Sequence, residues 1–159
     1  MSSKKTNAAR ELERMGVPFT LVEFEPDLED LSAVHAAKAL HADPETVFKT
    51  LVAHTQPGGI WMACVPAEAE LDFKKLAAVT GNKSAELVPL KEVLPLTGYM
   101  RGGCSPVGAK KPYPVVIHET AQLYDVIYVS AGRRGLQFLL RPDDLLRAVQ
   151  GRYADICRD

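Results

Sequence analysis

The sequence predicts a mixed α/β domain of the α+β type, in which helices pack around a curved β-sheet of mixed strand direction. Short apolar segments of strand composition recur along the chain, and glycine-rich turns join two pairs of them as hairpins. Amphipathic helical segments separate other strands, without the regular alternation of a parallel fold. With 159 residues, 47% hydrophobic and 25% charged, we expect a single domain over 1–159.

The first helix and the first strand follow from periodicity and from a breaker residue. An amphipathic helix is expected over Asn7–Met15, with Leu12 and Met15 facing inward, and it should stop at Gly16. A strand is expected next, at Phe19–Phe24.

The middle of the chain predicts a second helix and a hairpin. The helix should begin after Ser32, an N-cap residue, and continue to about Leu40. The apolar run Val47–Val52 predicts a strand, and the turn Gln56–Gly59 joins it to a partner strand at Ile60–Val65.

The next segment predicts two short helices and a strand. Asp72 can cap a helix over Phe73–Val79 that ends before Gly81, where a left-handed residue is expected. Lys91–Leu94 is expected to form another short helix, and Val115–Ile117 a strand.

The C-terminal part predicts a second hairpin and a last helix. The strands Asp125–Ser130 and Leu136–Leu140 flank Ala131–Gly135, which has the composition of a tight turn. Pro142 suits the first position of the last helix, because proline needs no hydrogen-bond partner for its nitrogen there.

Composition and charge exclude several classes of protein. No apolar stretch is long enough to span a membrane, and the N-terminus has no apolar signal core, so we expect a cytoplasmic location. The net charge of −1 gives no general attraction for nucleic acid, so an anion site must be local, and neither DNA nor a membrane is an expected partner. The cysteines and histidines lack the spacing of disulfide frameworks or metal ligands, so we predict no metal and no cofactor.

The segment Gly98–Pro112 holds four glycines, two prolines and three cations. Glycine lets backbone N–H groups approach a ligand, proline fixes the path of the chain, and Arg101, Lys110 and Lys111 attract an anion. The composition indicates a rigid loop that faces a negatively charged group, with a loop stiffened for stability as the alternative.

Lys49 interrupts an apolar strand. Alternate residues share a face, so Lys49 lies between Val47 and Leu51 on a face that would otherwise be core. Its ammonium group either reaches solvent along the strand edge or projects into a functional site.

The usual catalytic signatures are missing from the sequence, which has no G-x-S-x-G elbow, no P-loop and no dinucleotide fingerprint. Cys104, next to Ser105, is a candidate nucleophile in the glycine-rich loop. No histidine lies near it in the sequence to act as its base.

Four motifs occur in order over nearly the whole chain. They are the strand Val47-Phe48-Lys49-Thr50-Leu51, the segment Leu71-Asp72-Phe73-Lys74-Lys75, the loop from Thr97 to Lys111, and the hairpin from Ile127 to Leu136. Together they resemble the YbaK/EbsC family of aminoacyl-tRNA editing domains, which is related to the insertion domain of bacterial prolyl-tRNA synthetase. The chain is most similar to the YbaK branch, the freestanding Cys-tRNA(Pro) deacylases, which the ending Ala154-Asp155-Ile156 also resembles.

The resemblance implies a sheet curled toward a barrel, with helices around it, and a trans-editing hydrolase whose partner is mischarged tRNA. It also implies that the thiol of the substrate cysteine is the nucleophile, which would explain why the chain lacks one. Prolyl-tRNA synthetase is a candidate partner. The alternatives are a deacylase for another small residue, such as alanine on tRNA(Pro), and a non-catalytic module that binds tRNA or a synthetase.

The resemblance also implies the site residues. Catalytic roles are implied for Lys49, Gly102, Gly103 and Ser105. Substrate-binding roles are implied for Phe24, Thr50, Tyr99, Pro106, Gly108, Ser130, Gly132 and Gln137. Contacts to the tRNA are expected from Arg101, Lys110, Lys111, Arg133 and Arg134. Phe24 stands where the family often has tyrosine, and Gln137 where YbaK members commonly have aspartate.

Overall fold

The computed structural model describes residues 5–159, which form five α-helices, two short 3-10 helices and one eight-stranded sheet. The helices are α1 (Asn7–Arg14), α2 (Ala33–Ala39), α3 (Phe73–Thr80), α4 (Leu90–Thr97) and α5 (Pro142–Val149), with η2 (Pro44–Thr46) and η3 (Glu119–Leu123). The strands are β1 (Thr20–Glu23), β2 (Val47–Gln56), β3 (Gly59–Pro66), β4 (Ser84–Leu87), β5 (Val115–His118), β6 (Ile127–Arg133), β7 (Leu136–Leu140) and β8 (Arg152–Ala154).

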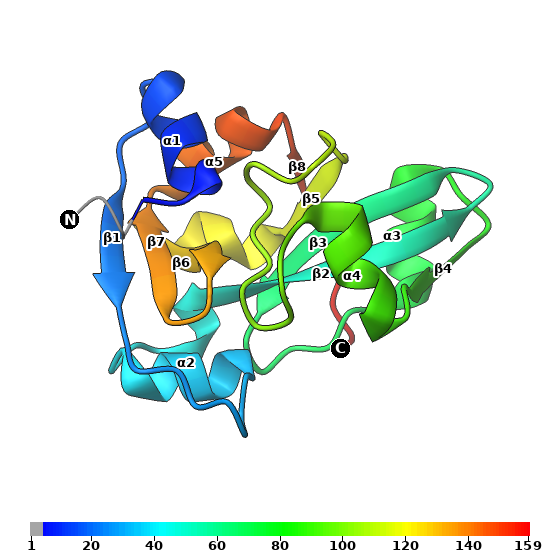
Figure 1. Cartoon of the computed structure of the whole chain (residues 1–159). Helices are drawn as coiled ribbons and strands as arrows, with labels where there is room; N and C mark the ends of the chain where they lie inside the picture. Colours follow the sequence, from blue (N-terminus) through cyan, green and yellow to red (C-terminus); the bar gives the residue numbers. More distant parts are fainter. Residues whose placement is uncertain (1–4) are drawn as a thin grey trace.

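The sheet has mixed strand directions, as predicted. Its strand order is β1-β7-β6-β2-β3-β5-β8, and β4 pairs with the second half of β2. Parallel pairing joins β2 to β6, β3 to β5 and β5 to β8, and the other neighbours are antiparallel. The sheet bends strongly between the β6–β7 hairpin and the long β2–β3 hairpin (Figure 1).

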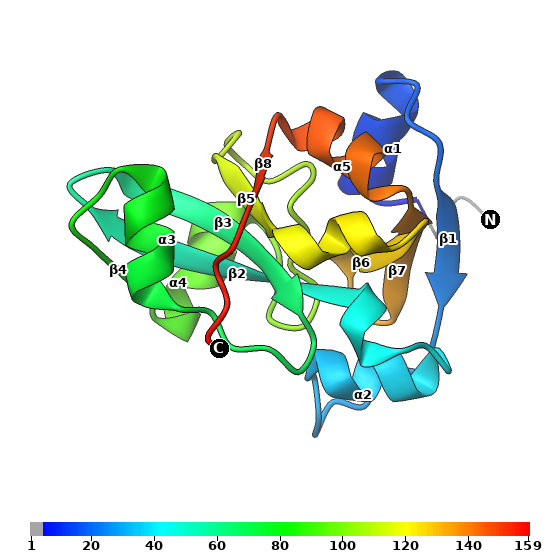
Figure 2. The ribbon, with the colours of Figure 1, turned by 180° about the vertical axis from the view of Figure 1, so that it is seen from behind.

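Helices cover both faces of the β2–β3 hairpin. In Figure 1, α4 lies in front of the hairpin and α3 behind it, and Figure 2 shows the reverse order from the opposite side. The larger core takes Val52 and Met62 from one face of the hairpin, together with residues of α4. The other face, which includes Ala53 and Val65, packs against α3.

One edge of β2 changes neighbour along its length. Its pairing with β6 ends at Phe48, and its pairing with β4 begins at Ala53. Between these two positions, β2 pairs with β3 alone among the strands of residues 5–159. The sheet therefore has a gap along residues 49–52, and a cavity opens there.

The predicted helix caps are confirmed. The hydroxyl of Ser32 accepts a hydrogen bond from the N–H of His35, and the carboxylate of Asp72 accepts one from the N–H of Lys75. Gly81 ends α3 in the left-handed conformation, and α5 begins at Pro142. These local signals could be interpreted without the tertiary fold because a cap acts over three or four residues.

Two predictions near the helices are wrong in detail. Met15 is 41% exposed instead of facing inward, because α1 ends at Arg14 and Met15 is its C-cap. The short helix predicted at Lys91–Leu94 is longer, since α4 begins at Leu90 and continues through Pro95 to Thr97.

Several strand predictions have the wrong bounds: β2 and β3 are longer than predicted, β1 is shorter, and β6 begins and ends later. β6 continues to Arg133 through an irregularity between Ser130 and Arg133, so the turn predicted at Ala131–Gly135 shrinks to its last two residues. β4 and β8 were not predicted, because their three or four mostly polar or partly exposed residues have no strand pattern of their own.

Candidate functional site

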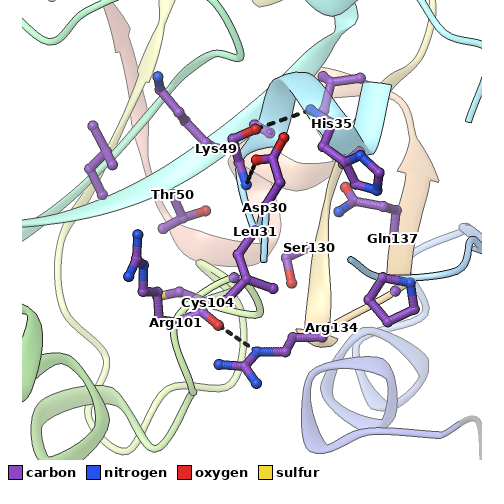
Figure 3. Close-up of a pocket in the computed structure, with 18 of the residues that line it drawn as sticks. Asp30, Leu31, His35, Lys49, Thr50, Arg101, Cys104, Ser130, Arg134 and Gln137 are labelled. Carbon is purple, nitrogen blue, oxygen red and sulfur yellow. Dashed lines mark hydrogen bonds between the residues drawn. The ribbon is translucent and has the colours of Figure 1, made fainter. Parts of the chain in front are cut away.

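The gap beside β2 opens into a cavity of about 390 Å³. Its walls come from the β2 edge, the segment that leads into α2, the β4–α4 region, and the glycine-rich loop with the β6–β7 hairpin. A volume of this size suits a small-molecule group. The charged and polar lining residues, several of which Figure 3 labels, are Asp27, Glu29, Asp30, Ser32, His35, Lys49, Thr50, Arg101, Ser130, Arg134 and Gln137.

Thr50 turns its main chain toward this cavity. On the β4 side of β2, the C=O of Val52 accepts a hydrogen bond from the N–H of Val88 at 3.0 Å. Between antiparallel strands, the N–H and C=O of one residue point to the same side, and residues two apart share that side. Thr50 therefore directs its N–H and C=O into the gap, where the described part of the chain gives it no strand partner.

Lys49 lies on the opposite face of β2 from the Thr50 side chain and is half-buried. Lys49 is among the residues that line the cavity, and its Nζ donates a hydrogen bond to the C=O of Ala67 at 3.0 Å. Burial lowers the pKa of the Lys49 ammonium, against smaller opposing effects of Cys157 and Glu70. The ammonium group is thus bound to the main chain at Ala67, away from the Thr50 side chain, instead of extending along the strand edge into solvent.

The glycine-rich loop docks on the β6–β7 turn. Nε of Arg134 donates to the C=O of Arg101 at 2.8 Å, a contact drawn in Figure 3. A Cβ on Gly103 would lie 3.0 Å from the Arg134 nitrogen, so the close approach requires glycine. The N–H of Gly103 itself donates to the C=O of Met100 at 2.9 Å. Gly102 lines the cavity with a φ of +84°.

The hairpin of β6 and β7 supplies the wall across from β2. Ser130 and Gln137 are directly opposed on these strands, and both line the cavity. The Ser130 hydroxyl accepts a hydrogen bond from the N–H of Gly132 at 3.1 Å. Phe24 lines the cavity beside Gly135, whose C=O accepts the Phe24 N–H.

The structure thus brings together part of the predicted site. Lys49, Gly102, Phe24, Thr50, Ser130, Gln137, Arg101 and Arg134 line the cavity. The other predicted site residues lie outside its lining, and they are Gly103, Ser105, Tyr99, Pro106, Gly108, Gly132, Lys110, Lys111 and Arg133.

Several of these outer residues shape the loop. Ser105 is fully buried, and its hydroxyl accepts a hydrogen bond from the N–H of Val107 at 3.2 Å. The Tyr99 hydroxyl donates to the C=O of Val107. A Cβ on Gly108 or Gly132 would lie within 3.0 Å of the Tyr99 side chain, so both glycines make room for it. Ser105 and Tyr99 therefore hold the conformation of the backbone that borders the cavity.

Cys104 lines the cavity as a protonated thiol. Burial raises the pKa of Cys104 to about 11, so the reactive thiolate is scarce at pH 7. We expect iodoacetamide to modify Cys104 about 100-fold more slowly at pH 7 than it modifies a free cysteine. Peptide mass spectrometry of timed samples measures this rate, and modification as fast as that of free cysteine would contradict the protonated state.

The segment before α2 and the first turn of α2 were missed by sequence reasoning. Asp30, Leu31 and His35 line the cavity, and Leu31 packs over Gly102, where an added Cβ would lie 3.1 Å from the Leu31 Cβ. No motif marks these residues, because they reach the cavity only through the packing of α2 beside β2. Leu87 and Val88 were missed for a related reason, since they belong to or follow the unpredicted strand β4.

Metal ligands are not grouped in the structure. Within residues 5–159, no cluster of three or more His, Cys, Asp or Glu side chains could hold a metal ion. Cys64, Cys104 and Cys157 are free thiols. In the same part of the chain, no helix has the length and apolar character needed to cross a membrane.

Comparison with known proteins finds relatives over nearly the whole chain. A profile of the aminoacyl-tRNA editing domain matches residues 29–148. The "Putative Cys-tRNA(Pro)/Cys-tRNA(Cys) deacylase EbsC" of Enterococcus faecalis is 43% identical over 155 residues, which cover 98% of this chain and 94% of that protein. The proline–tRNA ligase of Thermosipho africanus is 33% identical over 88 residues, which are 55% of this chain and 15% of that enzyme.

Solved structures share the fold. A crystal structure described as that of "a putative trans-editing enzyme for prolyl tRNA synthetase" superposes with a TM-score of 0.84 at 26% sequence identity. The superposition covers 96% of both chains. The mixed sheet and its surrounding helices are therefore the architecture of such editing proteins.

Proposed function

The chain belongs to the aminoacyl-tRNA editing domain family, and we propose that it is a trans-editing deacylase that removes cysteine mischarged onto tRNA(Pro). It is an aminoacyl-tRNA ester hydrolase whose substrate is a mischarged aminoacyl-tRNA. Cysteine is proposed as the acyl group because the relative that covers nearly the whole chain carries that specificity in its name. The location proposed for this activity is the cytoplasm.

The observation that carries the proposal is a cavity built for binding without an activated nucleophile. Among the described residues, the serine and threonine hydroxyls of its lining make no hydrogen bond to a histidine ring, and the Cys104 thiol is protonated. The Ser130 hydroxyl accepts the Gly132 N–H, and the Ser32 hydroxyl accepts the His35 N–H. The Cys104 thiol is kept protonated by burial. Such a site can orient an ester and stabilise its developing negative charge while the nucleophile comes from elsewhere.

The substrate's own thiol is the proposed nucleophile. The cysteinyl sulfur attacks the carbonyl carbon of its ester, the bond from that carbon to the ribose oxygen breaks, and the thiol proton passes to the departing ribose oxygen. The products are tRNA with a free hydroxyl and a cyclic thiolactone, which water then opens to cysteine. Alanine has no thiol, so its ester lacks this route.

Lys49, Thr50 and Gly102 are the groups proposed to hold the ester. The N–H of Thr50 faces the cavity and can donate to the carbonyl oxygen. Lys49 is the one lysine or arginine of β2, and its ammonium group is proposed to stabilise the oxyanion or bind the terminal phosphate. Gly102 lines the cavity without a side chain, so its backbone can approach the acyl group closely.

Arg101 and Arg134 are proposed to bind a phosphate of the tRNA 3′ end, because they line the cavity beside the glycine-rich loop. Lys110, Lys111 and Arg133 lie outside the cavity and are proposed to meet the acceptor stem. Prolyl-tRNA synthetase is a proposed partner, since it would supply the mischarged tRNA.

Arg134→Ala should raise the KM for aminoacyl-tRNA about 5- to 10-fold and weaken its dependence on salt, because one phosphate contact is lost. Steady-state deacylation at several salt concentrations measures both effects. Arg14→Ala is the matched control, since Arg14 is an exposed cation on α1 that pairs with Glu11. Equal effects of the two substitutions would contradict a phosphate site at Arg134.

The function itself is tested by incubating the purified protein with Cys-tRNA(Pro) and following the ester by acid precipitation. We expect the ester to disappear at least about 100-fold faster than in buffer. A non-catalytic binding module would form a complex with the tRNA and leave the lifetime of the ester unchanged, and this result would refute the proposal.

A further inference from the structure

Two buried polar atoms in the cavity wall have no hydrogen-bond partner in the structure of residues 5–159. They are Nε2 of His35 and Oε1 of Gln137, and both residues line the cavity. Gln137 is only 7% exposed. Buried polar atoms are rarely left unpaired, because water is lost and nothing replaces it. A bound group that offers hydrogen-bond donors could satisfy both atoms.

The two side chains reach the cavity from different elements. His35 lies in the first turn of α2, and Gln137 lies within β7. Figure 3 shows both at the same end of the cavity, away from the Arg101 guanidinium group. A ligand that contacts Arg101 at one end can thus contact His35 and Gln137 at its other end.

The wall that carries His35 is also negatively charged. Asp27, Glu29 and Asp30 precede α2 and line the cavity. Hydrogen bonds from Ser32 lower the pKa of Asp30, and the N–H of Ser32 donates to its carboxylate at 3.1 Å. Asp30 is therefore ionised at neutral pH and interacts electrostatically with His35.

The cavity consequently has two ends of opposite charge. Carboxylates stand on the wall before α2, and the cations Arg101 and Arg134 stand beside the glycine-rich loop. An aminoacyl ester of a nucleotide has the complementary polarity, with an α-ammonium group at one end and a phosphate at the other. Its ammonium group offers N–H donors, and both Oε1 of Gln137 and an unprotonated ring nitrogen of His35 are acceptors.

We propose that His35 and Gln137 form the site that receives the free α-amino group of the aminoacyl ester, with Asp30 supplying negative potential beside it. This inference rests on the proposed deacylase function and adds a requirement for the substrate. An ester without a free amino group, such as a peptidyl-tRNA, would lack the interaction and would be spared.

The test compares two esters of tRNA(Pro), one with cysteine and one with 3-mercaptopropionate, which is cysteine without its α-amino group. Each enzymatic rate is divided by the uncatalysed rate of the same ester, so that intrinsic lability cancels. We expect wild-type protein to favour the cysteinyl ester by about 10- to 100-fold, the effect of losing hydrogen bonds to a charged group.

His35→Ala and Gln137→Leu should each lower the rate of hydrolysis of the cysteinyl ester at least about 10-fold. They should change the rate for the 3-mercaptopropionyl ester less than about 3-fold. Gln137→Glu, which keeps an acceptor at the same position, should retain most of the cysteinyl activity. His54→Ala is the matched control, because His54 lies on β2 outside the cavity and should affect neither rate. Melting temperatures of all variants establish that they fold.

Each other outcome has a distinct meaning. Equal losses on both esters, or no loss on either, would overturn the assignment of His35 and Gln137 to the amino group. Wild-type protein that does not distinguish the two esters would overturn it as well. Wild-type protein that cleaves neither ester would refute the deacylase function on which the inference rests.

Discussion

Lys49→Ala is expected to lower kcat/KM for Cys-tRNA(Pro) at least about 100-fold, which is typical for the loss of a group that stabilises a developing oxyanion. Lys49 is a half-buried residue of the cavity lining, and water screens its charge less there than at the surface. Single-turnover deacylation under enzyme excess measures the loss directly, without a contribution from product release.

The fold should survive this substitution. The side chain makes one hydrogen bond, to the C=O of Ala67, and burial already opposes its charge. We expect the free energy of unfolding to change by less than about 1 kcal/mol. Lys74→Ala is the matched control, because Lys74 is an exposed lysine of α3 outside the cavity. An active and folded Lys49→Ala variant would contradict the role proposed for the ammonium group.

Gly102→Ala is expected to lower kcat/KM about 10- to 100-fold, because it moves the backbone that borders the acyl site. Gly102 has a φ of +84°, which L-residues rarely adopt, and the new methyl group would lie 3.1 Å from the Leu31 Cβ. The Leu31 Cβ is fixed to its own backbone, so the contact is relieved mainly by shifting the loop or the segment before α2.

Gly81→Ala is the control that distinguishes a shift of the backbone at Gly102 from the strain of a positive φ alone. Gly81 has a φ of +73°, and a Cβ there meets nothing within 4 Å. Both substitutions should cost about 1 kcal/mol of stability through the positive φ, measured by urea unfolding. Only Gly102→Ala should slow deacylation. Equal activity of the two variants would show that the shape of the loop at Gly102 is unimportant.

The elements that sequence reasoning predicted are those with local causes. The caps at Ser32 and Asp72 and the stop at Gly81 depend on three or four neighbouring residues, so they could be recognised without the fold. Lys49 could also be singled out, because a charge within an apolar strand is unusual in any context. These features depend little on distant parts of the chain.

The shape of the cavity could not be predicted in this way. The gap along residues 49–52 exists because β2 leaves β6 and later meets β4, a strand that is itself too short and too polar to be recognised. The direction of the Thr50 main chain follows from that register. His35 and Leu31 reach the cavity through the packing of α2, which no sequence motif describes.

The glycine-rich loop could be predicted only in part from the sequence. Its composition indicated a rigid segment with close backbone contacts, and Gly103 and Gly108 make such contacts with Arg134 and Tyr99. The sequence did not indicate which of its residues face the cavity, because that depends on the docking of the loop onto the β6–β7 turn. Gly102 lines the cavity, whereas Ser105 is buried behind it.

The most direct measurement is a competition in which wild-type protein acts on Cys-tRNA(Pro) and Ala-tRNA(Pro) in the same mixture. Thiol-assisted cleavage predicts that the cysteinyl ester is lost at least about 100-fold faster than the alanyl ester, after correction for the uncatalysed rates. An S-methylcysteinyl ester added to the mixture should be as stable as the alanyl ester. Loss of the alanyl or S-methylcysteinyl ester at the rate of the cysteinyl ester would contradict the account.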